Sequence, residues 1–242
     1  MGDCMSLRKF RYRALHGAAA LALAAAVGVL SGCQSVAGSQ AVSLVRVIDA
    51  SYNAPAVDVY VAQTQIAGNI AAPLITNYAI LSPGVQATNI DATGTTKVLA
   101  TVSGNYQAST QHSIYLSDSG TGFTATVLTD QVVAAPAGQF DVRFLQNANA
   151  VGNVDIYLVA DGSKFAAATP IAANLAPGQV TSYIPVDVGS YQLVIAPAGS
   201  TKASYTGSAV TYTSGQVRTL LITDQPNVDQ QPINVVVGDD VD

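Results

Sequence analysis

The sequence has 242 residues and a net charge of −5, and only 10% of its residues are charged. This length suits one large domain or two smaller ones. The sparse, acidic charge excludes a protein that neutralises phosphates, so we expect no nucleic-acid partner.

The chain begins with the features of an export signal. A basic segment, residues 8–13, precedes an apolar run over residues 14–30. The run is too short and too rich in alanine for a good membrane-spanning helix. A basic start followed by a short apolar stretch and small residues is typical of a signal peptide. We therefore expect a helical signal peptide over residues 1–32.

The signal ends in Leu30-Ser31-Gly32-Cys33, which resembles the lipobox of bacterial lipoproteins. The resemblance implies cleavage before Cys33 and lipid on its thiol, and the alternative is an ordinary secretory signal with an accidental cysteine. Cys4 lies in the part that would be removed, so the mature chain would hold one cysteine and no internal disulfide. We expect acyl chains such as palmitate to hold Cys33 at a membrane.

The residue after the lipidated cysteine indicates whether the protein is anchored in the inner or the outer membrane. In enteric-type bacteria an aspartate there favours retention at the inner membrane, so Gln34 resembles an outer-membrane lipoprotein. The expected location is exported and membrane-anchored, at the outer membrane of a Gram-negative host, facing the periplasm or the cell surface. Residues 33–42 would form the lipidated N-terminus and a linker.

The rest of the chain contains an internal repeat, residues 43–136 and 137–242. Val45-Arg46-Val47 corresponds to Val142-Arg143-Phe144 at an offset of 97 residues. Farther along, Tyr78 corresponds to Tyr183 at an offset of 105, which places eight extra residues in the second copy. Such self-similarity indicates one structural unit used twice.

Short runs of alternating apolar residues predict strands in each copy. In the first copy they cover residues 44–48, 57–63, 77–81, 87–91, 95–102, 113–116 and 123–128, and the second copy runs from 140–145 to 233–237. We expect an all-β fold of two tandem immunoglobulin-like antiparallel β-sandwich domains, with a single barrel as the alternative. The second domain should end in a solvated acidic tail over residues 238–242.

The alternation also predicts which side chains are buried. The apolar residues of the second strand in each copy should face the core, and these are Val57, Val59, Val61, Val154, Ile156 and Leu158. The residues between them, Asp58, Tyr60, Asp155 and Tyr157, should face outward.

The segment from Val45 to Val61 resembles the start of the bacterial domain-of-unknown-function family 4397. Those domains open with a strand, a short loop and then the sequence found here from Pro55 to Tyr60. They often occur in tandem behind export signals. The resemblance therefore implies a β fold and an exported location, and no activity.

Two repeated pairs are candidate functional or structural residues. If the first two strands of each copy pair, Arg46 would face Asp58, and Arg143 would face Asp155. Opposite charges across strands contribute about 0.2–1 kcal/mol. The favoured interpretation is a structural pair that fixes strand register, and the alternative is a small polar site present twice.

Tyr60 and Tyr157 are the candidate binding residues. An outward tyrosine presents an apolar ring and a polar hydroxyl, which suits a glycan or a protein surface. Tyrosine is also a good strand former, so a structural role is the alternative.

Little points to catalysis or to a bound cofactor. His112 is the one histidine after the signal, and it has no cysteine or glutamate nearby, so neither a metal site nor a cofactor is expected. No Gly-x-Ser-x-Gly motif is present. Asp118 and the aspartates of the tail could offer oxygens to calcium, but solvated carboxylates are the simpler interpretation.

These observations predict a lipid-anchored, non-enzymatic cell-envelope protein with a binding or structural role. Its expected partners are the membrane, through lipid on Cys33, and an envelope protein or a glycan. The alternatives are a carbohydrate-binding or adhesion module at the cell surface and a hydrolase that uses His112.

Overall fold

The computed structural model describes residues 41–227 and 229–241, and almost all regular structure in this part of the chain is β-strand. The first repeat holds β1 (Ser43–Asp49), β2 (Val57–Val61), β3 (Thr64–Ile70), β4 (Leu74–Ile75), β5 (Ala79–Leu81), β6 (Gly84–Ala92), β7 (Val98–Tyr106), β8 (Gln111–Ser119) and β9 (Gly122–Asp130). The second holds β10 (Gln139–Asn147), β11 (Val154–Ala160), the 3-10 helix η1 (Phe165–Ala167), β12 (Ala172–Leu175), β13 (Ile184–Asp187), β14 (Gly189–Pro197), β15 (Tyr205–Tyr212), β16 (Val217–Asp224) and β17 (Ile233–Val241). Among these residues, no helix has the length and hydropathy needed to cross a bilayer.

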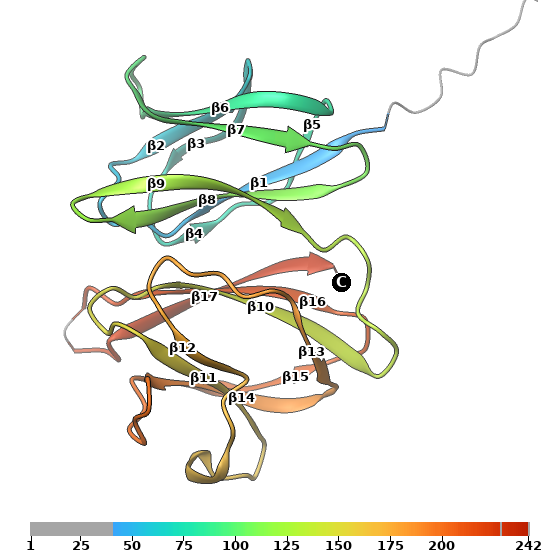
Figure 1. The fold of residues 1–242 in the computed structure, drawn as a ribbon, viewed down its shortest axis with the longest axis vertical. Helices are drawn as coiled ribbons and strands as arrows, with labels where there is room; N and C mark the ends of the chain where they lie inside the picture. The colour runs from blue at the N-terminus through green and yellow to red at the C-terminus, as the bar shows by residue number, and fades with distance from the viewer. Residues whose placement is uncertain (1–40, 228, 242) are drawn as a thin grey trace, which may run out of the picture. The chain divides into compact units, whose positions relative to one another are not determined.

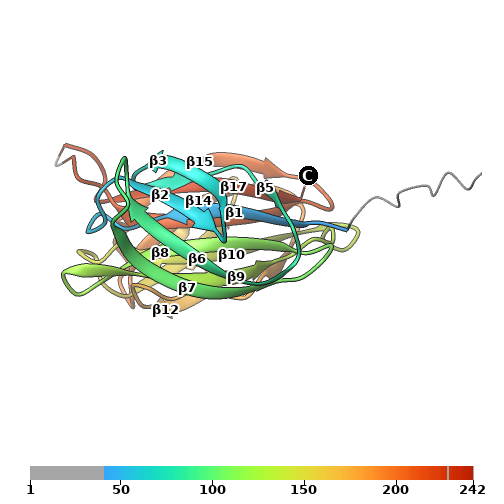
Figure 2. The ribbon, with the colours of Figure 1, turned by 90° about the horizontal axis from the view of Figure 1, so that it is seen from above.

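Each repeat forms two sheets of the same topology. In the first repeat, inner sheet 1 has the order β4-β1-β8-β9 with β5 also paired to β1, and outer sheet 1 has the order β3-β2-β6-β7. In the second, inner sheet 2 is β13-β10-β16-β17 and outer sheet 2 is β12-β11-β14-β15. Figure 1 shows the four sheets stacked as layers, and Figure 2 looks onto them from the side of outer sheet 1. The predicted all-β sandwich fold is therefore confirmed.

The expectation of purely antiparallel sheets is wrong in one respect. β1 runs parallel to β8, and β10 runs parallel to β16. Side chains alternate between the two faces in either kind of pairing, so alternation in the sequence does not reveal strand direction. Two strands, β3 and β4, were not predicted. β3 pairs with β2 through register shifts that interrupt its alternation, and β4 has two residues.

The sandwich cores are built from the predicted alternation. Val57, Val59 and Val61 of β2 are fully buried against the inward residues of β1 and β8. In the second repeat, Val154 and Ile156 are likewise fully buried, and Leu158 packs against the same core. These predicted core positions are confirmed.

The inner sheets are covered on both faces, because they also pack against each other. Ile48 and Tyr115 of inner sheet 1 form one apolar cluster with Leu145 and Leu221 of inner sheet 2. β1, β8, β10 and β16 are buried along most of their length, although polar residues are interspersed among the apolar ones. Four of these buried polar residues, Arg46, Ser113, Arg143 and Thr219, belong to the candidate site.

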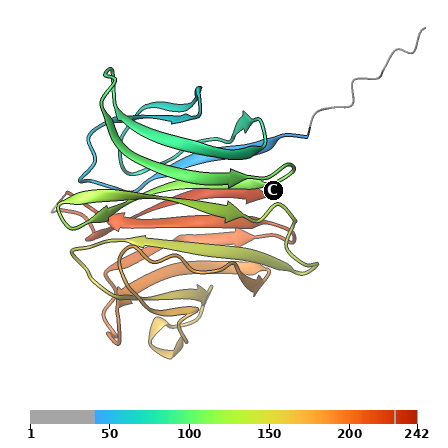
Figure 3. The same ribbon diagram turned by 45° about the horizontal axis from the view of Figure 1, so that its top comes forward.

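The C-terminal segment is a strand, so the predicted solvated tail is wrong for residues 238–241. β17 pairs with β16 from Ile233 to Val241, and Asp240 is buried. In Figure 3 this strand, in red, lies against the green strands of the first repeat. Asp242 lies outside the described residues.

The extra residues of the second repeat cover outer sheet 2. Phe165 of η1 packs edge-on against Tyr157 of β11, with ring centroids 4.9 Å apart. Residues around Val159 and Val194 complete this small apolar cluster. The two outer sheets therefore differ, because nothing equivalent to the inserted segment follows β2.

Candidate functional site

The best-formed polar site lies between the inner sheets and is centred on two repeated arginines. Arg46 stands on β1 between Val45 and Val47, whose side chains fill the core of the first sandwich. Because side chains alternate along a strand, Arg46 points the other way, toward the second repeat. Arg143 has the same position on β10. The two arginines are 1% and 3% exposed, so their charges must be balanced inside the protein.

Each arginine reaches an aspartate of the other repeat. Arg143 Nη2 lies 2.7 Å from Asp130 Oδ1, and Arg46 Nη2 forms an ion pair with Asp240 Oδ1. Arg46 Nε is also 3.8 Å from Asp130. Asp130 ends β9 and Asp240 lies near the end of β17, which are corresponding edge strands of the two inner sheets. The pairing is thus reciprocal across an approximate twofold axis, as in a symmetric dimer interface.

A hydroxyl residue connects the two charges within each repeat. Arg46 Nε donates to Ser113 Oγ at 2.9 Å, and Ser113 Oγ donates to Asp130 Oδ2 at 2.6 Å. In the second repeat, Arg143 Nε donates to Thr219 Oγ1 at 3.3 Å, and Thr219 Oγ1 donates to Asp240 Oδ2 at 2.6 Å. Strand register places each hydroxyl directly opposite its arginine.

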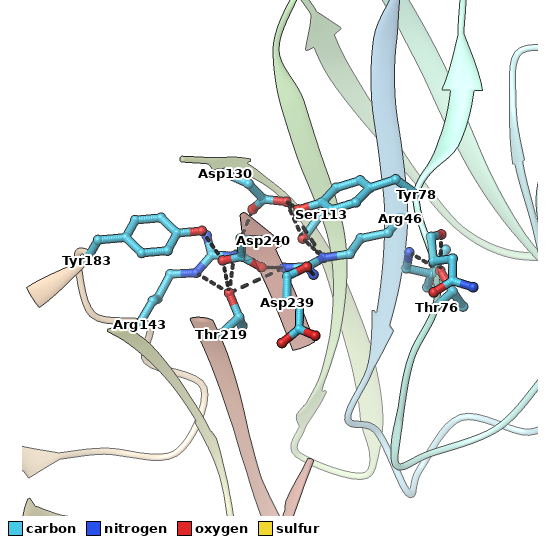
Figure 4. Close-up of polar contacts among 12 residues, drawn as sticks. Arg46, Thr76, Tyr78, Ser113, Asp130, Arg143, Tyr183, Thr219, Asp239 and Asp240 are labelled. Carbon is cyan, nitrogen blue, oxygen red and sulfur yellow. Dashed lines mark hydrogen bonds and ion pairs between the residues drawn. The ribbon is translucent and has the colours of Figure 1, made fainter. Parts of the chain in front are cut away.

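A tyrosine completes each half of the network, as Figure 4 shows. Tyr78 donates to Asp130 Oδ2 at 2.7 Å, and Tyr183 donates to Asp240 Oδ2 at 2.6 Å. The two guanidinium carbons lie 4.6 and 4.7 Å from the tyrosine ring centroids, within the range of cation–π attraction. Thr76 and Thr181 hold these segments in place by accepting the backbone N–H groups of Val47 and Phe144.

Burial and charge fix the protonation states in the network. Burial raises the pKa of the Tyr78 and Tyr183 hydroxyls above their ordinary value, so both remain hydrogen-bond donors. Burial alone would lower the pKa of Arg46, but its interactions with Asp240, Tyr78 and Asp130 together outweigh burial, and the net pKa is raised. The network thus holds two cations and two carboxylates, and its charges cancel. We call these eight residues the charge network: Arg46, Tyr78, Ser113, Asp130, Arg143, Tyr183, Thr219 and Asp240.

The predicted pairing of these arginines is wrong. Arg46 and Asp58 lie on strands of different sheets in the same sandwich, and so do Arg143 and Asp155. Asp58 instead accepts the backbone N–H groups of Asn69 and Gly94 at 2.7 and 3.1 Å, which lowers its pKa. Asp155 accepts the equivalent groups of Asn174 and Gly199, each at 2.7 Å. These carboxylates fix turns rather than strand register.

The two candidate binding tyrosines do not have equivalent surroundings. Tyr60 lies on the outer face of outer sheet 1 and is partly exposed. Tyr157 is only 8% exposed, because Phe165 and the inserted segment cover it. The expectation that both rings face solvent is therefore wrong for Tyr157, and a matched pair of aromatic platforms is ruled out.

His112 and Asp118 occupy structured surroundings. His112 is buried beside Tyr106, and its Nε2 lies 2.7 Å from Thr110 Oγ1. Burial lowers the pKa of His112, which favours the neutral ring. Asp118 accepts hydrogen bonds from Ser51 Oγ and the Asn53 backbone at 2.6 and 3.1 Å. Within the described residues, no group of three or more His, Cys, Asp or Glu could hold a metal ion. Cys33 lies outside them.

Sequence reasoning missed the acidic half of the network. Tyr78 and Tyr183 are visible as repeated residues, but Asp130 and Asp240 are 110 positions apart, so they match neither offset of the repeat. One signal was available. An arginine with apolar residues on both sides in a buried strand requires a buried counter-charge, and this pattern recurs in both copies at Arg46 and Arg143.

Comparison with known proteins finds one family model that matches part of the chain, and it indicates no function. Residues 43–157 match the family model described as domain of unknown function DUF4397, which confirms the resemblance over that stretch. The match runs from β1 to Tyr157 in β11. No curated protein matches the chain.

Among solved structures, one similar chain is CBMbc of family CBM26 from Eubacterium rectale Amy13K, in complex with maltoheptaose. It is 10% identical with a TM-score of 0.28, and the alignment covers 80% of this chain and 96% of that one. A likeness this distant supports no conclusion about the present chain.

Proposed function

We propose, from the premise that residues 43–157 match DUF4397, that this chain is a lipid-anchored protein of the cell envelope with a non-catalytic binding or structural role. The signal anatomy and the lipobox-like end at Cys33 support the anchor. Gln34 supports an outer-membrane location in a Gram-negative host.

The observation that carries the non-catalytic role is the closure of the charge network. Its ionic groups pair with each other across the two repeats, and all of them are buried. A reacting group needs access to a substrate and a partner that can move a proton. The network instead joins two sandwiches into one unit whose outer sheets face in opposite directions, which suits a binding or structural role.

The anchor is tested by membrane fractionation of wild type and Cys33→Ala. Cys4→Ala is the matched control, since Cys4 lies in the segment that would be removed. We expect wild type and Cys4→Ala in the membrane fraction and Cys33→Ala in the soluble fraction. An unchanged distribution of Cys33→Ala would refute lipid anchoring.

Protease treatment of intact cells then decides which side the domains face. Cleavage of the wild type from outside supports a surface-binding role, and protection supports a periplasmic one. The hydrolase alternative predicts that a hydrolytic activity of the wild type is lost in His112→Ala. We expect no such difference.

A further inference from the structure

The approximate twofold symmetry of the charge network is broken at one position, beside Arg46. Strand register pairs Ser113 with Leu128 in the first repeat and Thr219 with Gly238 in the second. Leu128 and Gly238 are therefore corresponding residues. Leu128 packs against the apolar cluster between the inner sheets. Gly238 has no side chain, so Ile75 and Arg46 Nη1 approach β17 more closely than a Cβ would allow, and a space remains beside them.

This space is a cavity of about 200 Å³ between β17 and the segment that joins β4 to β5. Water occupies about 30 Å³ in the liquid, so the cavity has room for about six water molecules or a small ligand of similar volume. Its lining residues are Arg46, Ile75, Thr76, Asn77, Tyr78, Val237, Gly238 and Asp239. In Figure 4, Asp239 and Thr76 lie on either side of Arg46.

Arg46 has a donor to spare on this side. Nε and Nη2 bond to Ser113, Thr219 and Asp240, while Nη1 has one acceptor among the described residues, the Asp239 carbonyl at 3.3 Å. Because Nη1 carries two N–H groups, one remains for a ligand. Nη1 also lies beside Gly238, since a Cβ built there would be 3.1 Å from it.

The charges around the cavity disfavour an anion. Arg46 is already neutralised by Asp240, and the Asp239 carboxylate lies on the opposite face of β17, where it pairs with Arg218, so no unpaired positive charge of Arg46 faces the cavity. A ligand here meets the Arg46 Nη1 donor and the Asp239 carbonyl acceptor, and Asn77 and the apolar residue Ile75 also line the cavity. Hydroxyl groups both donate and accept, so this combination suits a neutral polyhydroxylated ring.

We propose that the cavity beside Arg46 binds a single neutral hexose unit, such as a residue at the end of a glycan. This proposal rests on the binding role proposed above and names its ligand class. Both repeats contribute to the cavity, so the site exists only in the tandem protein.

The test is an NMR titration of the full chain, purified in detergent, with glucose and N-acetylglucosamine, and with sodium acetate as the anion probe. We expect at least one sugar to give saturable shifts at the Gly238 amide and the Asn77 side chain, and acetate to give none. No saturable shift with either sugar, or tighter binding of acetate, would overturn the proposal.

Three variants locate the site. Gly238→Ala places a methyl group 3.0 Å from Ile75 Cγ2 and 3.1 Å from Arg46 Nη1, so it should weaken sugar binding at least tenfold. Asn77→Ala changes an exposed rim residue that the fold does not need, and it should weaken binding at least fivefold. Ser182→Ala, at the corresponding position of the second repeat, should bind as wild type does. If Asn77→Ala and Gly238→Ala both retain full affinity, the ligand binds elsewhere and the assignment is wrong.

The NMR titration and the membrane fractionation test separate proposals, so either proposal can be refuted without the other. Sugar binding is measured on purified protein and is unaffected by where the chain resides. A wild-type protein found in the soluble fraction would refute the anchor but would not affect the sugar-site proposal. Titrations without saturable shifts would refute the sugar site but would not affect the anchor.

Discussion

At the scale of single residues, the charge network is stable only while it is complete. Charged groups buried without partners lose their hydration and gain nothing in return. Each arginine here has a carboxylate of the other repeat, a hydroxyl of its own repeat and a tyrosine ring. The large cost of removing one member follows from the groups that it leaves behind.

We expect Arg143→Met to lower the free energy of unfolding by about 3 to 5 kcal/mol, because Asp130 would stay buried without this ion-pair partner. Urea denaturation followed by circular dichroism measures this change. Adding Asp130→Asn should recover part of the loss, since the remaining group is neutral. Lys97→Met is the control, because Lys97 is exposed. A loss no larger than that of the control would show that the ion pair contributes little.

Asp49 is a buried carboxyl group whose ionised form destabilises the fold, in contrast to the ion-paired aspartates of the charge network. Burial raises its pKa from 3.8 to about 6, and its Oδ2 has no partner among the described residues. The folded state therefore holds a proton that the unfolded state loses between about pH 4 and pH 6. The contribution of Asp49 is favourable below this window and is lost as the pH rises through 6.

Asp49→Asn removes this unfavourable ionisation and keeps an acceptor for the Ser51 N–H. We expect the variant to be more stable than wild type at pH 7, by about 3 kcal/mol, and nearly equal to it at pH 4. Urea denaturation at the two pH values provides the measurement. An equal difference in stability between the variant and wild type at both pH values would mean that Asp49 does not titrate in this range.

At the scale of elements, alternation in the sequence predicted the strands but not how they join. The valines of β2 are placed correctly because period-two alternation depends only on neighbouring residues. The partner of Arg46 is 194 positions away, and no local pattern carries that information. The charge of the final residues favoured a solvated tail, yet these residues form half of β17, where strand pairing and the buried Asp240 outweigh their polarity.

Truncation distinguishes the strand from a tail. Removing residues 238–242 would end β17 early and take Asp240 from Arg46, so we expect a loss of at least about 3 kcal/mol in unfolding free energy. Removing residue 242 alone should have no measurable effect. Thermal melting of both truncated proteins provides the comparison, and equal melting temperatures would restore the solvated-tail interpretation.

At the scale of the whole molecule, the inner sheets couple the repeats. They share an apolar cluster as well as the charge network. Two sandwiches joined this way should unfold together, so we expect one calorimetric transition with equal calorimetric and van't Hoff enthalpies.

Leu145→Asp should separate that transition into two, because it places an unpaired charge inside the shared cluster. Val85→Asp is the matched control, since Val85 on β6 is 74% exposed. A single transition in Leu145→Asp, merely shifted to lower temperature, would show that the repeats are held together by other contacts.

The reciprocal pairing of the repeats also bears on how the chain evolved. Two identical subunits related by a twofold axis would make every contact twice, and a gene duplication that joined them would preserve that geometry. Identical subunits must carry the same residue on both sides of the axis, whereas a joined pair can diverge. Leu128 on one side and Gly238 on the other are such a divergence. A tandem chain thus has a freedom that a homodimer lacks, because the two halves of its internal interface can carry different residues.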